Sequence, residues 1–268
     1  MSLRIYLIAR PHFDAEAFWS FLEDQNTSWK RTGGATEAEQ IVEVSGRVCY
    51  LSFGEHQSPR NSAEYIANLI RLGHESVLEH VSWTFLLTGV SRAFTHQLVR
   101  HRVGFAFSQL SQQYHDETSA EFVEPPELVQ FPEALAAWRA AMASTQKAYR
   151  TISGALIAME RDPQWRGLRK EARRAIRSAA RSVLPNATET KIMVTANARA
   201  LRHFFKVRGS IPGDMEMRRV AAALLKRLVP EAPSLFADFS LERLEDGSPI
   251  VVHHDMEKGA LERSVASI

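Results

Sequence analysis

The sequence predicts an α+β fold in a single domain that spans residues 1–268. Short runs of β-branched and apolar residues, such as Leu3–Ala9 and Val81–Thr88, indicate strands. Longer stretches with apolar residues at helical spacing, several of them opened by capping residues, indicate helices. No internal repeat, low-complexity tract or clear linker divides the chain. One domain with a mixed or antiparallel sheet and several long helices therefore follows.

The expected elements follow one another along the whole chain. Thr36 and Glu39 form a capping-box pattern that starts a helix running to about Val44, and Asn61 to Glu64 repeats that pattern. Ser91 caps a further helix, which Gly104 ends. Helices are also expected at 14–23, 131–159, 165–183, 186–207 and 215–228, and a hairpin at 240–252 that turns at Asp246-Gly247. Residues 253–268 have little to bury and are expected to fray.

Charge and hydropathy argue against a nucleic-acid-binding protein and against a membrane protein. Lys and Arg number 33 against 31 for Asp and Glu, so the net charge of +2 gives no general electrostatic case for nucleic acid or membrane binding. No apolar run reaches the roughly 18 residues of a membrane span, and the chain meets charge at Arg4, unlike a signal peptide. A hydrophobic content of 45% is enough to bury a core. A cytoplasmic globular protein is therefore expected.

Cysteine usage limits the chemistry. The one cysteine, Cys49, excludes an intrachain disulfide and an all-cysteine metal site. Its setting, Arg47-Val48-Cys49-Tyr50, favours a buried structural thiol over a nucleophile. Cys49 is therefore expected in the core.

The segment Ser91–Tyr114 carries the densest set of hydrogen-bonding and cationic groups. On its helix, Gln97, Arg100 and His101 fall at i, i+3 and i+4 and share one surface. An amide, a guanidinium and an imidazole together suit an anionic, planar ligand such as a nucleotide. Phe107–Tyr114 is then expected as a turn or short loop that adds hydroxyl and amide groups. Alternatively, the cations only decorate a helix C-terminus, where they favour the macrodipole.

The helix expected at 186–207, opened by Asn186–Glu189, carries polar groups on two faces. Eleven residues return a helix almost to its starting azimuth, so one side presents Asn197, Leu201, Phe204 and Arg208. Arg199 and His203 form an i, i+4 pair beside them. An ordinary amphipathic helix with a polar outer face is the alternative.

Two other clusters keep different functions open. A basic stripe could bind RNA or DNA, lie in solvent, or place an arginine on a phosphate; it comprises Lys170, Arg174, Arg177 and Arg181. Two histidines and two carboxylates invite a metal-hydrolase hypothesis; they are His74, Glu75, Glu79 and His80. Their spacing differs from H-E-x-x-H, so ligand positioning or structural hydrogen bonding is favoured and no metal site is assigned. Neither G-x-G-x-x-G nor G-x-x-x-x-G-K-[ST] is present, so side chains must hold any nucleotide.

Arg100-His101-Arg102, followed after eight residues by Ser111, resembles the signature of the flavin-dependent thymidylate synthases. The resemblance covers roughly residues 47–239, and its segments occur in the family's order. The segments are Gly73–Ser76 with Glu79-His80, Gln97–Arg102, Ser108–Gln112, Arg181–Thr190, and Asn197–Arg199 with His203 and Arg208.

The resemblance implies a homotetramer in which FAD lies extended at subunit junctions, so that each active site draws on several chains. The family transfers a one-carbon unit from methylenetetrahydrofolate to C5 of dUMP, and FAD reduced by NADPH supplies the hydride that completes the methyl group. Carried over residue by residue, the FAD contacts are Ser76, Glu79, Arg100, His101, Arg102, Gln109, Asn197, Ala198, Arg199 and His203. The uridylate contacts are Gln97, Leu98, Val99, Arg100, Gln109, Leu110, Ser111, Gln112, Gln113, Arg181 and Arg208. No nucleic-acid or membrane partner is implied.

The residue chemistry agrees with that scheme. Uracil C5 is a poor nucleophile, and the ordinary solution is to add a cysteine thiolate at C6. Cys49 lies in no Pro-Cys-His-like setting, which disfavours the cysteine-dependent thymidylate synthase. By the resemblance, Arg208 would instead stabilise uracil deprotonated at N3, which raises the electron density at C5. Arg181 would anchor a phosphate, and Ser111 would bind or position, because no neighbouring base is evident.

Three features depart from the family pattern. The shorter family form has seven residues where this chain has eight between Arg102 and Ser111, with Gly104 as the residue that absorbs the extra one. Gln113 stands where some members have an arginine near the nucleotide phosphate, and Ser210–Asp214 stands where many have a His-Ala pair. The acceptor pocket can therefore differ, and a UMP/dUMP C5-methylase of nucleoside-antibiotic biosynthesis is the alternative.

Overall fold

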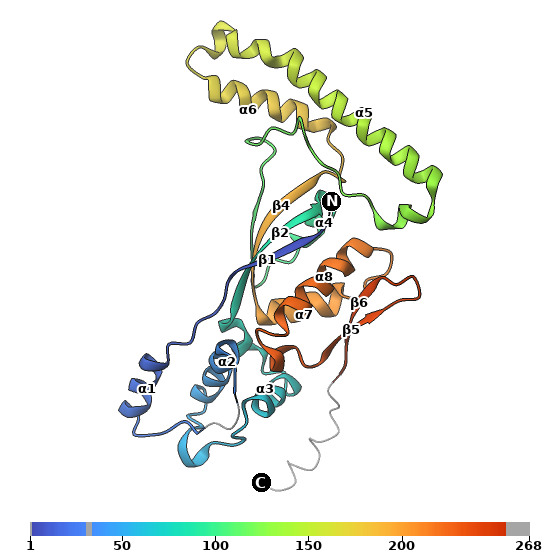
Figure 1. Ribbon diagram of the computed structural model, residues 1–268. Helices are drawn as coiled ribbons and strands as arrows, with labels where there is room; N and C mark the ends of the chain where they lie inside the picture. Colours follow the sequence, from blue (N-terminus) through green and yellow to red (C-terminus); the bar gives the residue numbers. More distant parts are fainter. Residues whose placement is uncertain (1, 31–33, 256–268) are drawn as a thin grey trace. The chain divides into compact units, whose positions relative to one another are not determined.

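The computed structural model describes residues 2–30 and 34–255 (Figure 1). The strands are β1 (Arg4–Ala9), β2 (Ser82–Ser91), β3 (Phe105–Gln109), β4 (Glu189–Asn197), β5 (Phe239–Arg243) and β6 (Pro249–His253). The helices are α1 (Ala15–Asp24), α2 (Glu37–Val48), α3 (Ser62–Arg71), α4 (Arg92–Leu98), α5 (Pro132–Leu156), α6 (Arg169–Ala180), α7 (Ala198–Arg208) and α8 (Met215–Leu228). One sheet has the strand order β1-β2-β4-β3, and β5 pairs with β6 antiparallel. The predicted α+β class is confirmed.

The chain divides into two compact units, each assembled from separate segments. The first unit comprises Met1–Tyr6, Leu86–His101 and Phe107–Val194, and the second comprises Leu7–Phe85, Arg102–Ala106 and Thr195–Ile268. The prediction of a single domain over 1–268 stays a prediction, and the tail beyond Asp255 lies outside the described residues.

The helix starts predicted at Asp14, Thr36 and Asn61 are confirmed, because local side chains there satisfy the exposed amides of the first turn. The Asp14 carboxylate accepts a hydrogen bond from Ala17 N at 3.0 Å, and Asn61 Oδ1 accepts one from Ala63 N at 2.9 Å. Thr36 and Glu39 form both halves of a capping box. Helix α8 spans the predicted residues, and the closing hairpin turns at Asp246-Gly247 as expected.

The predicted helix over 186–207 is wrong in its first half. Glu189–Asn197 is strand β4, and the helix begins only at Ala198, where the Asn197 side chain accepts from Ala200 N. Burial alternates along β4, with Ile192, Val194 and Ala196 buried and the residues between them more exposed, which is the period of a strand. Pairing of this segment with neighbouring strands therefore stabilises it more than the helix that the capping pattern at Asn186–Glu189 predicted.

Two predictions around the Arg-His-Arg triplet also need correction. Helix α4 ends at Leu98, where turn hydrogen bonds from Arg100 N to Gln97 O (3.2 Å) and His101 N to Leu98 O (3.1 Å) replace the helical pattern. Arg100 and His101 therefore lie beyond the helix and do not share a helical face with Gln97. The turn or loop predicted from Phe107 begins with the last residues of β3, and the turn itself follows Gln109.

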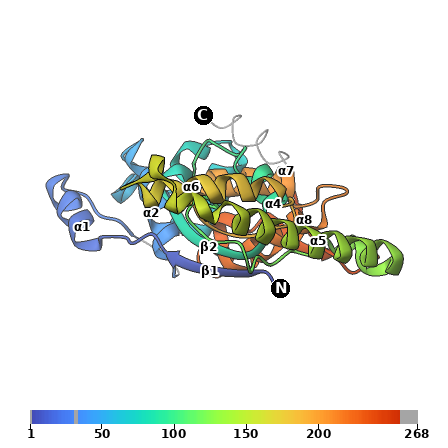
Figure 2. The same cartoon turned by 90° about the horizontal axis from the view of Figure 1, so that it is seen from above.

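The first unit contains a long helical hairpin. Figures 1 and 2 both show α5 and α6 side by side, and the two helices are in contact. Helix α5 buries only Tyr149, whose hydroxyl accepts a hydrogen bond from Glu117 N at 3.1 Å. Apolar side chains stay exposed around its two ends, notably Phe131 and Ile157.

The second unit is built around α7 and α8. Their buried faces include Leu201, Phe204 and Leu225, and Phe205 packs edge-on against Phe236 with ring centroids 5.9 Å apart. The β5–β6 hairpin contacts both helices, as Figure 1 shows. This packing fixes the end of α7 and the turn after it.

Cys49 is exposed, which corrects the prediction of a buried thiol. It follows the last residue of α2, and its Sγ donates to Ser45 O at 3.3 Å. Burial in this part of the helix goes instead to Glu43 and Arg47, which form an ion pair at 2.7 Å. Among the helices of the described chain, none is long and apolar enough to cross a membrane.

Candidate functional site

Gln109, at the end of β3 in the first unit, has a fixed side-chain orientation. Its Nε2 donates to Thr95 Oγ1 at 3.0 Å and to Thr190 Oγ1 at 3.3 Å. Thr95 lies on α4 and Thr190 on β4, and both threonines are fully buried. The amide is therefore preorganised, as expected of a group that recognises a planar ligand.

A tight turn follows Gln109 and carries Ser111–Gln113. Ser111 O accepts hydrogen bonds from Tyr114 N at 3.1 Å and His115 N at 2.9 Å, and its hydroxyl accepts one from Gln113 N at 3.3 Å. The Ser111 hydroxyl thus accepts a hydrogen bond from the backbone of its own turn, which agrees with a role in positioning that turn. Gln113 reaches α6, where its Nε2 donates to Ser178 Oγ at 3.3 Å.

Two arginines of the basic stripe hold this turn. Arg177 Nη1 donates to Tyr114 O at 2.7 Å, and the Arg174 guanidinium lies 4.8 Å from the centre of the Tyr114 ring. The stripe is therefore not simply a solvated face. Arg181 follows α6 and is exposed.

Arg92 and Glu117 also belong to this region, although neither was predicted from the sequence. Arg92 Nη2 donates to Leu110 O at 2.8 Å. Burial lowers the pKa of Arg92, and Glu117 and Arg181 lie close enough to act on it in opposite directions. Glu117 is 4% exposed; burial raises the pKa of its carboxyl, against the pull of His115 and Arg92. Ser91, just before Arg92, indicates only the start of a helix. No local pattern in the sequence links Glu117 to Arg92.

Arg92 and Gln112 each carry a buried donor without an acceptor, and they are among several such groups in the described part of the first unit. Within the described residues, Arg92 Nε and Gln112 Nε2 are buried and have no hydrogen-bond partner. Buried polar groups without partners cost free energy, so such donors indicate a missing acceptor. A phosphate or a pyrimidine carbonyl supplies acceptors of the required kind. The Leu98 side chain, at 1% exposure, is core, so only its backbone could touch a ligand.

The second unit gathers most of the residues predicted to contact FAD around the N-terminus of α7. Asn197 caps the helix, and its backbone N donates to Gly104 O at 3.0 Å. Arg199 forms ion pairs with Glu79 and, at 3.6 Å, with Glu75. Hydrogen bonding to Glu79 raises the pKa of Arg199. The two carboxylates of the metal hypothesis therefore face a guanidinium, and no cluster suited to a metal ion occurs among the described residues.

The two predicted residue sets are distributed unequally between the units. The uridylate set lies in the first unit except for Arg208, which ends α7 in the second. The second unit holds these members of the FAD set: Ser76, Glu79, Arg102, Asn197, Ala198, Arg199 and His203. The first unit holds the others: Arg100, His101 and Gln109. His203 lies one turn after Arg199 and is exposed, as the i, i+4 spacing predicts.

Gly104 lies against the N-terminus of α7 within the second unit. It adopts φ +72°, and an added Cβ would lie 2.7 Å from Asn197 Nδ2 and 2.8 Å from the Cβ of Ala200. Only glycine fits both the left-handed backbone and the space. The glycine expected to absorb the extra residue of the motif thus has a structural requirement of its own.

Gly104→Ala is expected to destabilise the protein by about 1–3 kcal/mol, because it combines backbone strain with a clash at the α7 cap. It is also expected to weaken FAD binding, since Asn197 and Arg199 move with that cap. Thermal melting and flavin titration measure the two effects. Gly154→Ala, where the added Cβ has nothing within 4 Å, is the control, and equal behaviour of the two variants would contradict the prediction.

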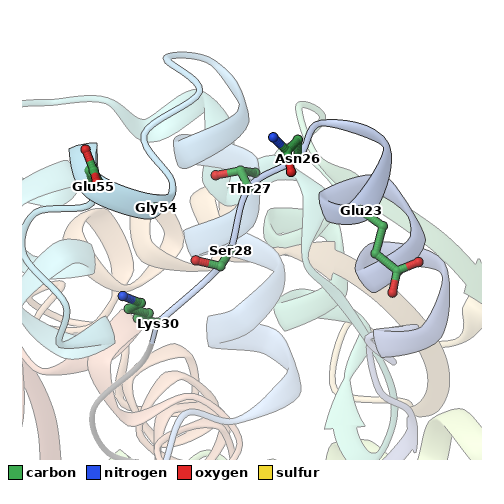
Figure 3. A pocket seen from close by; sticks show the side chains of 7 residues that line it. All are labelled: Glu23, Asn26, Thr27, Ser28, Lys30, Gly54 and Glu55. Carbon is green, nitrogen blue, oxygen red and sulfur yellow. The ribbon is translucent and has the colours of Figure 1, made fainter.

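The second unit also contains a hollow of about 700 Å³ (Figure 3). It is lined by Glu23, Asn26, Thr27, Ser28, Lys30, Gly54 and Glu55, none of which belongs to the predicted sets. The lining is polar and open to solvent, whereas small-molecule sites are mostly apolar and enclosed. The hollow is therefore not the candidate site.

Comparison with known proteins gives a consistent result. Residues 33–234 match the family model described as thymidylate synthase complementing protein. The chain is 44% identical over 250 residues to a protein of Mycolicibacterium gilvum (strain PYR-GCK), an alignment that covers 92% of this chain and 94% of the relative. It is 42% identical over 251 residues to one of Mycobacterium sp. (strain JLS), with 92% and 94% covered. It is 41% identical over 251 residues to one of Mycobacterium leprae (strain Br4923), with the same coverage.

All three relatives are named flavin-dependent thymidylate synthase. The match covers most of the chain, and it includes both the Arg-His-Arg segment and the α7 residues. The resemblance seen in the sequence is thereby confirmed. The chain belongs to the flavin-dependent thymidylate synthase family.

Proposed function

We propose that the protein is a flavin-dependent thymidylate synthase. It would convert dUMP, methylenetetrahydrofolate and NADPH to dTMP, tetrahydrofolate and NADP, without a cysteine nucleophile. The observation that carries this proposal is the pair of buried donors without acceptors, Arg92 Nε and Gln112 Nε2, beside the fixed amide of Gln109. Family membership supplies the reaction, and these donors supply a place for the nucleotide.

The first unit would bind the nucleotide. Arg181 and Arg92 are close enough for their charges to interact, and an anionic phosphate between two guanidinium groups relieves that repulsion. The Gln113 side chain is hydrogen-bonded to Ser178. Arg92 and Arg181 would therefore bind the phosphate in place of the arginine that some family members have at the position of Gln113. Ser111 would position the turn, since its hydroxyl already accepts from Gln113 N.

The donor set at α7 fits FAD. Arg102, Arg199 and His203 are exposed cationic or imidazole groups near a helix N-terminus, which suits a diphosphate. Bound and reduced by NADPH, FAD supplies the hydride that completes the methyl group. Arg208 would stabilise negative charge on a uracil deprotonated at N3, which makes C5 nucleophilic without sulfur. Cys49 takes no part in the reaction.

A homotetramer and a cytoplasmic location are part of this proposal, and nucleic acid is not a partner in it. Exposed apolar side chains on the α5 region, Val129, Phe131 and Ile157, support association between chains, because such surface is usually covered. Each active site is proposed to draw on several chains.

The test is an absorption spectrum of the purified protein, followed by titration with dUMP and with UMP. We expect flavin bands, a spectral change with dUMP, and turnover that prefers dUMP. Colourless protein that does not take up FAD contradicts the proposal. Equal turnover of dUMP and UMP would instead favour the UMP/dUMP C5-methylase. Salt-sensitive binding of RNA or DNA without flavin would favour the alternative based on the basic stripe.

A further inference from the structure

The turn that follows Arg208 lies directly against strand β6. Gly209 O accepts a hydrogen bond from Val251 N at 2.9 Å. A Cβ added to Gly209 would lie 2.6 Å from the Cβ of Val251 and 2.5 Å from Phe205 O. No side chain larger than hydrogen fits there, so the hairpin packs closely on the last turn of α7.

Arg218, on α8, reaches the same turn from the next helix. Its Nη1 donates to Ile211 O at 3.0 Å, and its Nη2 donates to Ser248 Oγ, beside β6, at 3.1 Å. The residue is 6% exposed, and within the described residues its buried Nε has no hydrogen-bond partner. Burying a cation costs free energy unless it is hydrogen-bonded. The two hydrogen bonds of the guanidinium join the turn after α7 to the residue that precedes β6.

The hairpin end of this connection is itself anchored. Ser248 is 4% exposed, and its backbone N donates to Asp246 Oδ1 at 2.8 Å. Hydrogen bonds from Ser248 lower the pKa of Asp246, with smaller contributions from the charges of Arg218 and Arg219. The hydrogen bonds thus run from Asp246 through Ser248 and Arg218 to Ile211, three residues after Arg208.

We propose that Arg218 is a positioning residue for Arg208. By fixing Ile211 O against the hairpin, it sets the conformation of the turn at 209–213 and with it the direction of the Arg208 guanidinium. The proposal rests on the proposed function, in which Arg208 meets the uracil. The turn at Ser210–Asp214 departs from the family pattern. In this chain, Arg218 of α8 and Ser248 of the C-terminal hairpin fix its conformation, so the proposal adds a residue to the proposed function.

The test is a double-mutant cycle in flavin-loaded protein, with dUMP affinity by titration and kcat and KM by steady-state kinetics. Arg218→Ala is expected to lower kcat/KM for dUMP roughly ten- to hundred-fold. Arg218→Lys keeps the charge and can reach one of the two acceptors, so it should recover part of the loss. Arg219→Ala, the adjacent exposed arginine, is the matched control and should leave kcat/KM unchanged. In an Arg208→Ala background, Arg218→Ala should have almost no further effect.

Hydrogen exchange of the backbone amides of the turn at 209–213, where only Pro212 has none, provides a readout that does not need activity. These amides should exchange faster in Arg218→Ala and at the normal rate in Arg219→Ala. If Arg218→Ala does not fold, Ser248→Ala removes one acceptor and should give a smaller change in the same direction. Additive losses in the cycle, or unchanged exchange and kinetics, overturn the positioning role. Failure of the unsubstituted protein to bind flavin or dUMP contradicts the proposed function instead, while the exchange result still tests the link between Arg218 and the turn.

Discussion

Arg208→Ala is expected to lower kcat/KM for dUMP by about 10²–10³-fold while the protein keeps its fold and its flavin. Arg208 ends α7, and the turn after it is fixed by the contact of Gly209 with Val251. A guanidinium held in place stabilises developing negative charge without reorganising during the reaction. The proposed chemistry has no other group in this role, and Cys49 lies at the end of a different helix, α2.

The pH dependence gives a second readout of the same substitution. A cation beside N3 favours the deprotonated uracil, so removing it should raise the apparent pKa of N3 and move the pH–rate profile to higher pH. Arg208→Lys should fall between the two proteins, since it keeps the charge and loses the planar fork. Lys206→Ala, an exposed cation on the same helix, is the control. Normal turnover by Arg208→Ala would mean that N3 stabilisation by this residue must be abandoned.

Asp238→Ala is expected to cost about 3–5 kcal/mol of unfolding free energy, the largest stability effect predicted for this chain. The Asp238 carboxylate accepts two hydrogen bonds from Arg202, both at 2.6 Å, and the two side chains are 2% and 1% exposed. Removing the carboxylate leaves the Arg202 guanidinium buried, with a hydrogen bond to Leu235 O at 2.6 Å. Because Arg202 lies on α7, the loss should also loosen Arg199 and Arg208.

Urea unfolding monitored by circular dichroism measures this cost. Asp255→Ala is the matched control: its carboxylate is 98% exposed and lies 3.5 Å from His253, which also contacts Asp238. The control should change the unfolding free energy by less than about 0.5 kcal/mol. A double replacement, Arg202→Met with Asp238→Leu, should destabilise less than Asp238→Ala alone, because no buried charge is left unpaired. A small loss in the single variant would show that the pair is not needed.

The same pair also sets a pH dependence. Burial alone would raise the pKa of Asp238, and the hydrogen bonds and charge of Arg202 more than offset this, so the pKa lies below its ordinary value. A carboxyl whose pKa is lowered by folding stabilises the protein above its unfolded pKa and loses that contribution as the pH falls through the folded value. Acid unfolding below about pH 4 should therefore be less steep in Asp238→Ala.

Local sequence signals determined much of the fold. Helix starts at Asp14, Thr36 and Asn61 depend on a side chain reaching an amide two or three residues away, and the α8 and hairpin boundaries are equally local. The Arg-His-Arg segment and the residues of α7 also determined the family, because motif spacing is a property of the chain alone. The residue roles carried over from the family remain predictions.

Only the tertiary structure decided the rest. Strand β4 overrode a helix-capping signal, because hydrogen bonds to neighbouring strands and burial of alternate residues outweigh a local cap. The sequence indicates no role for three residues of the site, Arg92, Glu117 and Arg218. Each interacts with residues distant in the sequence or across a turn whose conformation cannot be predicted from the sequence. Capping acts over a few residues and can be recognised in the sequence. The partners of a buried charge are known only once the chain has folded around it.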